Sequence, residues 1–338
     1  MRRRPFSIAS VIIGITCILL VVVGLVKLIR FNTEFSKNTG LNLGTVVRLL
    51  VDGGAPLKTS DNRVNILLLG MAGGIHDGPD LTDTIIVASF DTKKHTVSLI
   101  SLPRDIWSDA LKDKINSAYH YGEAKKTGGG IVLSRAIMED VTGLPMHYVV
   151  TLDFTQFENL IDVLGGIDVN VTTGFTDTEF PIAGRENDEC DGDTKFLCRY
   201  ETITFATGVQ HMDGVTALKY VRSRHAEGDE GTDFARGRRQ QDVILALKEK
   251  IMSLQPWFHP SIATNLLKSA DTATDTDMTL GEQLTVGKMA LQLSGSMQKI
   301  SIEHLLSVPP TWMYGRYVLV PETDYETIHS YIQQELGK

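Results

Sequence analysis

An uncharged and mostly apolar stretch covers residues 8–26, near the start of the chain. With about 1.5 Å of rise per residue, a helix of this length crosses the hydrocarbon core of a bilayer. A secretory signal has a shorter apolar segment followed by a small-residue cleavage site, and neither feature is clear here. The pattern predicts an uncleaved transmembrane helix over residues 8–29. A buried core helix is the alternative.

The charges around this stretch bear on its orientation. Arginines occupy positions 2–4, and Lys27, Arg30 and Lys37 follow the apolar run. The positive-inside rule favours a cytoplasmic N-terminus by a small margin. We therefore expect residues 1–7 in the cytoplasm, a polar stalk over residues 30–63 outside it, and an extracytoplasmic domain from residue 64.

Short apolar runs with the length of buried strands begin at residue 65. They cover residues 65–70, 84–90 and 96–102, and a turn at residues 91–94 makes the last two an antiparallel hairpin. Asp83 precedes the second run and Arg104 follows the third, so both fall at the open end of the hairpin. From this pair alone, an ordinary salt bridge at a sheet edge is the favoured interpretation.

Helical and strand patterns then alternate, which is typical of an α/β domain with helices packed on a central sheet. The predicted elements are helices at 130–141 and 153–164 and strands at 147–151 and 167–171. Residues 174–202 are acidic and irregular, and we interpret them as a surface loop. The domain predicted over residues 64–255 is followed by a C-terminal portion, 256–338, which packs on it and contains helices at 280–293 and 325–336 and a strand at 317–321.

Two arginine patterns occur between residues 211 and 251. Arg222 and Arg224 are two positions apart, so in extended backbone both side chains point the same way. Thr232 or Asp233 can then cap a long helix that reaches about residue 254. The positive end of the helix dipole would lie close to both arginines.

One face of that helix carries the next candidate residues. Asp233, Arg236 and Gln240 follow at i, i+3 and i+7 and share this face. Arg239 lies close to it, whereas Arg238 points away. Arginine forks fit phosphate oxygens in bidentate fashion, so the converging arginines predict a pyrophosphate site. A solvated charged helix face is the alternative.

Charge and cysteine content narrow the class of protein further. The net charge of −8 argues against nucleic acid as a partner. Cys17 lies in the apolar run, while Cys190 and Cys198 flank a polar loop without the spacing of a zinc site. A Cys190–Cys198 disulfide suits an oxidising compartment, and two free thiols are the alternative.

Several motifs in order resemble the LytR-CpsA-Psr family of envelope glycopolymer transferases. They are NILLLG (65–70), TDTI (82–85), SLPRD (101–105), KINSAYHYG (114–122), YVRSR (220–224) and DFARGRRQQ (233–241). The resemblance implies a three-layer α/β/α domain with a mixed central sheet and a long apolar groove. It also implies a phosphotransferase that moves a glycan from a polyprenyl-pyrophosphate carrier onto a peptidoglycan hydroxyl, forming a phosphodiester. Two alternatives stay open: a hydrolase of the lipid-linked pyrophosphate, and a non-catalytic regulator or glycan-binding module.

The resemblance also implies roles for individual residues. Asp83 would bind Mg²⁺ or Mn²⁺, Arg104 would bind pyrophosphate or order the metal site, and Asp233 would act as base or orient the arginines. The implied pyrophosphate cluster is Arg222, Arg224, Arg236 and Gln240. The implied substrate-binding residues are Asp105, Lys114, Asn116, Tyr119 and Arg239.

The chain also departs from the family pattern beside Asp83. Leu81 occupies a position where many members have arginine, and Met71 and Ala72 occupy positions where many have an aspartate. The intervening loop supplies His76, Asp77 and Asp80 instead. Asp77 or Asp80 is a candidate second metal ligand, and solvated loop residues are the alternative.

Overall fold

The computed structural model describes residues 55–73, 78–185, 187–253, 275–293 and 297–337, together with Thr33. The chain divides into two units, residues 1–54 and 55–338, and the description below concerns the second. Among the described residues, no helix combines the length and the apolar character needed to cross a bilayer. The transmembrane helix predicted at residues 8–29 lies outside them.

The centre of the unit is a five-stranded mixed sheet with the strand order β11-β3-β2-β1-β6. β1 runs antiparallel to β2 and parallel to β6, while β3 runs antiparallel to β2 and parallel to β11. The mixed sheet agrees with the sequence interpretation. Its strands are β1 (Arg63–Met71), β2 (Thr82–Asp91), β3 (Thr96–Ser101), β6 (Tyr148–Asp153) and β11 (Gln298–Ser301).

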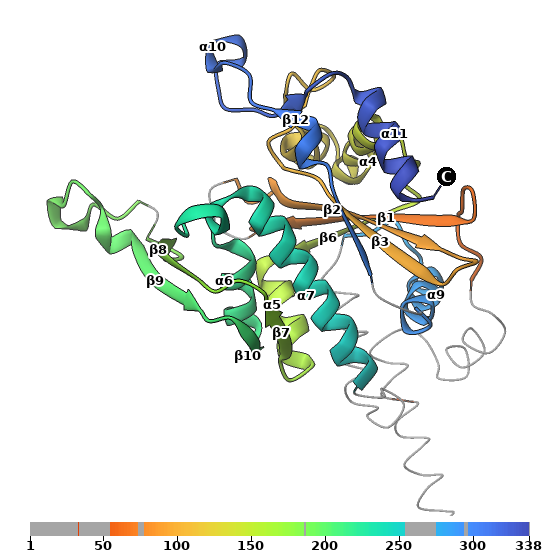
Figure 1. Ribbon diagram of the computed structural model, residues 1–338, viewed down its shortest axis with the longest axis horizontal. Helices are drawn as coiled ribbons and strands as arrows, with labels where there is room; N and C mark the ends of the chain where they lie inside the picture. Colours follow the sequence, from red (N-terminus) through yellow and green to blue (C-terminus); the bar gives the residue numbers. More distant parts are fainter. Residues whose placement is uncertain are drawn as a thin grey trace, which may run out of the picture. The chain divides into compact units, whose positions relative to one another are not determined.

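Helices cover both faces of this sheet, which gives three layers (Figure 1). Side chains such as Leu67, Val87 and Ile100 pack against α3 (Ala118–Lys125), α4 (Gly129–Thr142) and α11 (Tyr325–Glu335). Side chains at alternate positions, such as Ile66 and Ala88, pack against α7 (Asp233–Ser253) and α9 (Leu280–Leu291). The alternation follows from strand geometry, in which successive side chains point to opposite faces.

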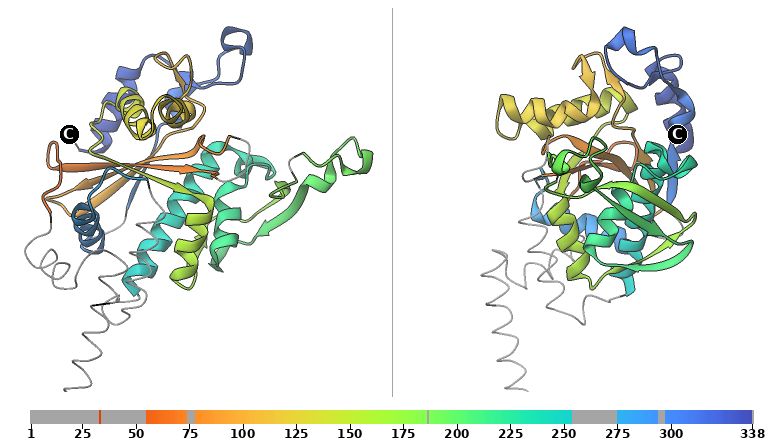
Figure 2. Two further views of the ribbon diagram at one scale, coloured as in Figure 1. Left: turned by 180° about the vertical axis from the view of Figure 1, so that it is seen from behind. Right: turned by 90° about the vertical axis from the view of Figure 1, so that its left-hand side faces the viewer.

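A second core forms beside the sheet, around the middle of α7 (Figure 2). It is built from α5 (Phe154–Val163), α6 (Gly214–Arg222), β7 (Ile167–Val171), β10 (Gly208–Met212), β8 (Phe175–Pro181) and β9 (Tyr200–Phe205). β8 and β9 correct the sequence interpretation of residues 174–202 as a surface loop. Phe175, Asp177 and Phe180 are buried there because they face the second core.

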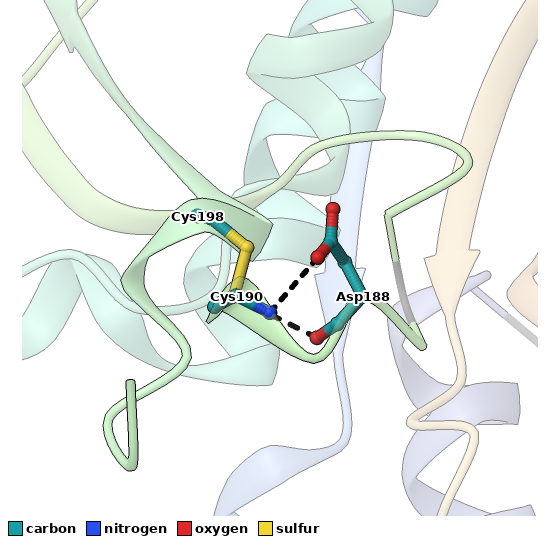
Figure 3. Close-up of side chains that lie close together, drawn as sticks. All are labelled: Asp188, Cys190 and Cys198. Atoms are coloured by element: carbon teal, nitrogen blue, oxygen red, sulfur yellow. Dashed lines mark hydrogen bonds between the residues drawn. A yellow bond between two sulfur atoms is a disulfide. The ribbon is translucent and has the colours of Figure 1, made fainter. Parts of the chain in front are cut away.

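The tip of the β8–β9 hairpin is closed by a disulfide between Cys190 and Cys198, with Cα atoms 5.5 Å apart (Figure 3). This is the pairing that the sequence favoured. The Cys190 N–H donates to Asp188 Oδ1 (2.9 Å). The hairpin projects from the helices that form the second core (Figure 1).

The two ends of the unit differ from the predicted boundaries. Residues 55–62, expected in the stalk, already pack on the domain: the Ala55 N–H donates to Thr285 Oγ1 and the Lys58 N–H to the Tyr148 hydroxyl. At the other end, β11 joins the central sheet as its edge strand. The remaining short elements are β4 (Trp107–Ser108), β5 (Asp113–Lys114), β12 (Leu306–Ser307), β13 (Val320–Pro321) and α10 (Thr311–Tyr314).

Candidate active site

Asp83 and Arg104 meet at one edge of the sheet, where β2 begins and β3 ends. The Leu102 N–H still donates to the Ile85 carbonyl (2.9 Å), which holds the two strand ends together. Arg104 Nη1 donates to Asp83 Oδ1 in an ion pair. The Asp83 side chain is 38% exposed and that of Arg104 is 18% exposed, so a ligand can reach the pair.

Two of the predicted substrate-binding residues, Asp105 and Lys114, form a chain of polar contacts that ends at Arg104. Asp105 is buried, and its Oδ1 accepts a hydrogen bond from Lys114 Nζ. Its other oxygen lies 3.6 Å from Arg104 Nε. Asp105 and Lys114 therefore position the guanidinium of Arg104 and are not among the residues that line the cavities beside Asp83.

A cavity of about 420 Å³, called here the apolar cavity, lies beside Asp83 on the side of β1 and β6. Apolar side chains from β1, β6, α5, α6 and α7 form most of its wall, among them Leu68, Val150, Phe157, Leu160, Val243 and Leu247. The lining changes character along α7, from Arg236 and Gln240 to Val243, Ile244 and Leu247. Eleven residues of helix span roughly 16 Å, so the cavity has a polar end and an apolar end.

Arg222 and Arg224 both line the apolar cavity. Arg222 is the last residue of α6, and its guanidinium carbon lies 4.2 Å from the ring centroid of Phe154, a cation–π distance. Arg224 follows after the helix ends at Ser223. Both arginines reach the same cavity as expected, although Arg222 is helical and not in the extended backbone that the sequence argument assumed.

Asp177, which the sequence reading missed, holds the turn between these arginines. The carboxylate is fully buried and accepts hydrogen bonds from Ser223 Oγ (2.6 Å) and from the backbone N–H groups of Arg224 and His225 (3.1 Å each). Burial alone would raise the pKa of Asp177. The hydrogen bonds outweigh burial, so its pKa lies below the ordinary 3.8.

The first turns of α7 bring the second arginine pattern to the same place. Thr232 is the residue that caps the helix, because its Oγ1 accepts from the Ala235 N–H (3.1 Å). Arg236 is buried and lines the apolar cavity with Gln240, whose Nε2 donates to Thr84 Oγ1 (2.7 Å). Asp233 begins the helix, and its side chain lies outside the described part of the structure.

A second space, of about 100 Å³ and called here the small cavity, lies on the β3 side of Asp83. Asp83, Arg236 and Gln240 line it as well as the apolar cavity. The other residues that line it include Ser101, Arg104, Arg238, Ser301 and Glu303. The side chain of Arg238 is 54% exposed, and its Nη2 donates to Glu230 Oε1 (3.3 Å), a residue that lines neither cavity.

Arg239 does not belong to this group. Its side chain is 2% exposed, and its nitrogens donate to the carbonyls of Tyr220 and Ser223 and to Glu230. Burial lowers the pKa of Arg239, and Glu230 opposes that shift. The predicted role in substrate binding is replaced by a structural one: Arg239 ties α7 to the end of α6.

The structure also separates Asn116 and Tyr119 from the cavities. Asn116 is buried, and its backbone carbonyl accepts a hydrogen bond from Thr82 Oγ1 (3.2 Å). Tyr119 packs in the core between the sheet and α4, and its hydroxyl donates to Asp275 (2.9 Å). Burial first, and then Asp275, raise the pKa of Tyr119. Neither side chain is among those that line the two cavities.

Asp80 is the candidate second metal ligand that the structure describes, and it pairs with a histidine. Asp80 Oδ2 lies 2.8 Å from His120 Nδ1, while His76 and Asp77 lie outside the described residues. In the part of the chain that is described, the one group of three ligand-type side chains is Asp188, Cys190 and Cys198. Its sulfurs are bonded to each other and cannot act as thiolate ligands (Figure 3).

The fold and the site together define a three-layer α/β domain with an arginine-lined cavity beside an Asp–Arg ion pair. The chain belongs to the LytR_cpsA_psr family, whose model matches residues 36–333.

Two curated relatives were compared by sequence. The chain is 29% identical over 191 residues to the polyisoprenyl-teichoic acid–peptidoglycan teichoic acid transferase TagU of Bacillus mycoides, covering 55% of this chain and 52% of that protein. It is 30% identical over 205 residues to the regulatory protein MsrR of Staphylococcus aureus. This match covers 59% of this chain and 52% of that protein. The chain thus spans about half the length of these relatives.

A solved structure was compared by shape. TagT bound to LIIa-WTA, a protein known from Bacillus subtilis, superimposes with a TM-score of 0.56 and covers 84% of this chain and 95% of that one. The identity is 23%, so this likeness shows the fold alone.

Proposed function

We propose that this protein is a membrane-anchored phosphotransferase that moves a glycan from a polyprenyl-pyrophosphate carrier onto a hydroxyl of peptidoglycan. The observation that carries the proposal is the lining of the apolar cavity, which includes Arg222, Arg224 and Arg236 and becomes purely apolar further along α7. Such a space complements an isoprenoid chain with an anionic head group. The transferase name of the TagU relative supports the same reading.

The arginines would bind and orient the donor. Planar guanidinium groups hold phosphate oxygens in bidentate fashion and neutralise charge that develops as the phosphoryl group transfers. Phe154 and Asp177 keep Arg222 and Arg224 in place before the donor arrives, which lowers the entropy lost on binding. The walls of the apolar cavity would exclude water from the carrier chain.

A divalent ion fits the site through Asp83. The carboxylate is accessible, lines both cavities and keeps one oxygen that no hydrogen bond or ion pair between described residues occupies. One carboxylate with substrate phosphates is a usual set of Mg²⁺ ligands, and Mn²⁺ accepts the same ligands. When bound, the ion would withdraw charge from the phosphoryl oxygens. Arg104 would hold the Asp83 carboxylate in the orientation needed to bind the ion.

The proposal includes the location of the enzyme. Residues 8–29 would anchor the chain, and the domain would lie outside the cytoplasm. The disulfide of the β8–β9 hairpin supports an oxidising compartment. Protease added to intact cells, with any outer membrane permeabilised, should digest the domain, and complete protection would contradict this location.

The test of the activity is product analysis with the full chain in detergent. Polyprenyl-pyrophosphate-linked glycan and peptidoglycan oligomers are supplied with Mg²⁺, and mass spectrometry follows the products. We expect a phosphodiester between glycan and peptidoglycan together with polyprenyl phosphate. Chelation of the metal and Asp83→Asn should each remove the product, while Asp191→Asn at the hairpin tip should not. Release of free glycan phosphate alone would identify a hydrolase, and no conversion would favour a binding or regulatory protein.

A further inference from the structure

The two cavities beside Asp83 lie on opposite sides of one strand. In the order β11-β3-β2-β1-β6, β2 carries Asp83 and is the middle strand. The apolar cavity draws its sheet residues from β2, β1 and β6, whereas the small cavity draws them from β2, β3 and the residues at the end of β11. Asp83, Arg236 and Gln240 are shared, so a phosphoryl group held by them faces both spaces.

This arrangement matters for a displacement at phosphorus. The attacking and leaving oxygens lie roughly in line, on opposite sides of the transferring group. Under the proposed function the leaving group is polyprenyl phosphate, whose chain occupies the apolar cavity. The nucleophile must therefore approach from the β3 side, through the small cavity.

We propose that the small cavity receives the acceptor hydroxyl and that Glu303 is the general base that takes its proton. This inference rests on the proposed function and adds to it an acceptor site and a catalytic residue. No motif of the sequence pointed to Glu303, which lies far beyond the last arginine pattern.

Glu303 is suited to this role by its position and surroundings. Among the described residues, the acidic residues that line the small cavity are Asp83 and Glu303. Asp83 is engaged by Arg104, whereas no hydrogen bond or ion pair within the described ranges engages the carboxylate of Glu303. The backbone of Glu303 is fixed, because its N–H donates to Ser301 Oγ (3.3 Å) and a short 3₁₀ helix (Glu303–Leu305) starts there.

The proposed step balances without a further reactant. The acceptor hydroxyl oxygen forms a bond to the phosphorus attached to the glycan, and its proton passes to the Glu303 carboxylate. The bond from that phosphorus to the bridging oxygen of the pyrophosphate breaks, and polyprenyl phosphate departs with its electrons. The proton then leaves Glu303 for solvent, which the exposed side chain contacts.

Kinetics of the full chain test this assignment, with the same lipid-linked donor and peptidoglycan oligomers. Glu303→Gln should lower kcat for transfer about 100-fold, the lower end of the range for a general base, with unchanged donor affinity. Glu303→Ala should be equally slow, and added formate should restore its rate at least tenfold (an order-of-magnitude expectation for a carboxylate acting as a base). A residue with only a structural role would not respond to formate.

Glu322→Gln provides the matched control, because Glu322 is exposed, directly follows β13 and lines neither cavity. It should transfer at the wild-type rate. A Glu303→Gln enzyme that keeps the wild-type kcat, or a Glu303→Ala enzyme that formate does not rescue, overturns the role of Glu303 and leaves the proposed function standing. A wild-type enzyme that joins no glycan to the acceptor overturns both.

Discussion

The apolar cavity and the small cavity share Asp83, Arg236 and Gln240, and α7 borders both, but their other walls differ. Residues of β1, β6, α5 and α6 complete the apolar cavity, whereas the ends of β3 and β11 and Glu303 complete the small one. The larger space is suited to holding a chain and the smaller one to a polar reaction. The two cavities lie on opposite sides of β2. Variants in the apolar cavity should therefore change donor affinity, and variants in the small cavity should change kcat.

Arg236 is the residue whose loss should damage both sides, because it lines both cavities. Under the proposed function, Arg236→Ala removes a charge-assisted contact to the pyrophosphate, worth about 1.5–3 kcal/mol, or about 10- to 150-fold. We expect weaker donor binding and a lower kcat. Arg236→Lys should recover little of either, since the charge remains but the bidentate fork is lost. Donor titration and steady-state transfer rates measure the two effects.

Arg185→Lys is a suitable control for this series, because Arg185 is exposed on the β8–β9 hairpin and lines neither cavity. Arg238, which the helix periodicity would suggest as a control, borders the small cavity and is unsuitable. An Arg236→Ala protein that binds and transfers normally would show that Arg236 does not contact the pyrophosphate of the donor.

Leu160 offers a way to affect the apolar cavity alone. It lines that cavity but is not part of the buried core clusters among the described residues. Leu160→Asp places a carboxylate beside the carrier chain at a cost of about 2 kcal/mol, or about 30-fold in donor affinity. Once donor is saturating, kcat should stay close to the wild-type value.

The matched variant is Leu197→Asp, in which an exposed leucine at the hairpin tip is changed in the same way. It should bind the donor normally. If Leu160→Asp leaves donor affinity unchanged, the carrier chain does not occupy the apolar cavity. The division of the site into a donor cavity and an acceptor cavity would then be wrong.

The sequence predicted the apolar cavity far better than the small one. Strands and helices over residues 64–254 have strong periodicity, and the shared face of Arg236 and Gln240 follows from helix geometry. Arg222 and Arg224 also line one cavity as the RxR spacing predicted, although Arg222 ends a helix and is not in extended backbone. These features are local, so they can be read from neighbouring residues.

The features that the sequence reading missed depend on distant contacts. Periodicity cannot decide whether Arg239 faces the cavity or the end of α6, because that depends on where α6 packs. Asp177 lies in an acidic stretch in which a charged residue occupies a buried strand position, so no apolar alternation marks the strand. β11 has four residues and pairs with β3, and nothing within it identifies its partner.

Of the variants that weaken donor binding, substitution of Asp177 should have the smallest effect. Asp177 holds the backbone beside Arg222 and Arg224 and does not line either cavity. Asp177→Asn keeps the shape but loses the charge that the Ser223 hydroxyl and two backbone N–H groups stabilise. We expect a loss of about 1–2 kcal/mol in unfolding free energy and a few-fold weaker donor binding. Denaturant unfolding and donor titration measure these two quantities.

The lowered pKa of Asp177 gives this prediction a pH dependence. A carboxyl group whose pKa is lower in the folded state stabilises the fold above its unfolded pKa. That contribution disappears as the pH falls below about 4, towards the folded pKa. The stability difference between wild type and Asp177→Asn should therefore shrink in acid. A difference that is constant with pH would mean that the charge of Asp177 contributes nothing.

The edge strand β11 has a consequence for the timing of biosynthesis. Its pairing with β3 joins side chains 200 positions apart, as in the hydrogen bond between Ser98 and Gln298. During synthesis from the N-terminus, the donor side of the site can assemble while this edge is still missing. Glu303 reaches its place only when β11 docks. Under the proposed function, a nascent chain that still lacks β11 would have the residues of the donor side of the site but not those of the acceptor side.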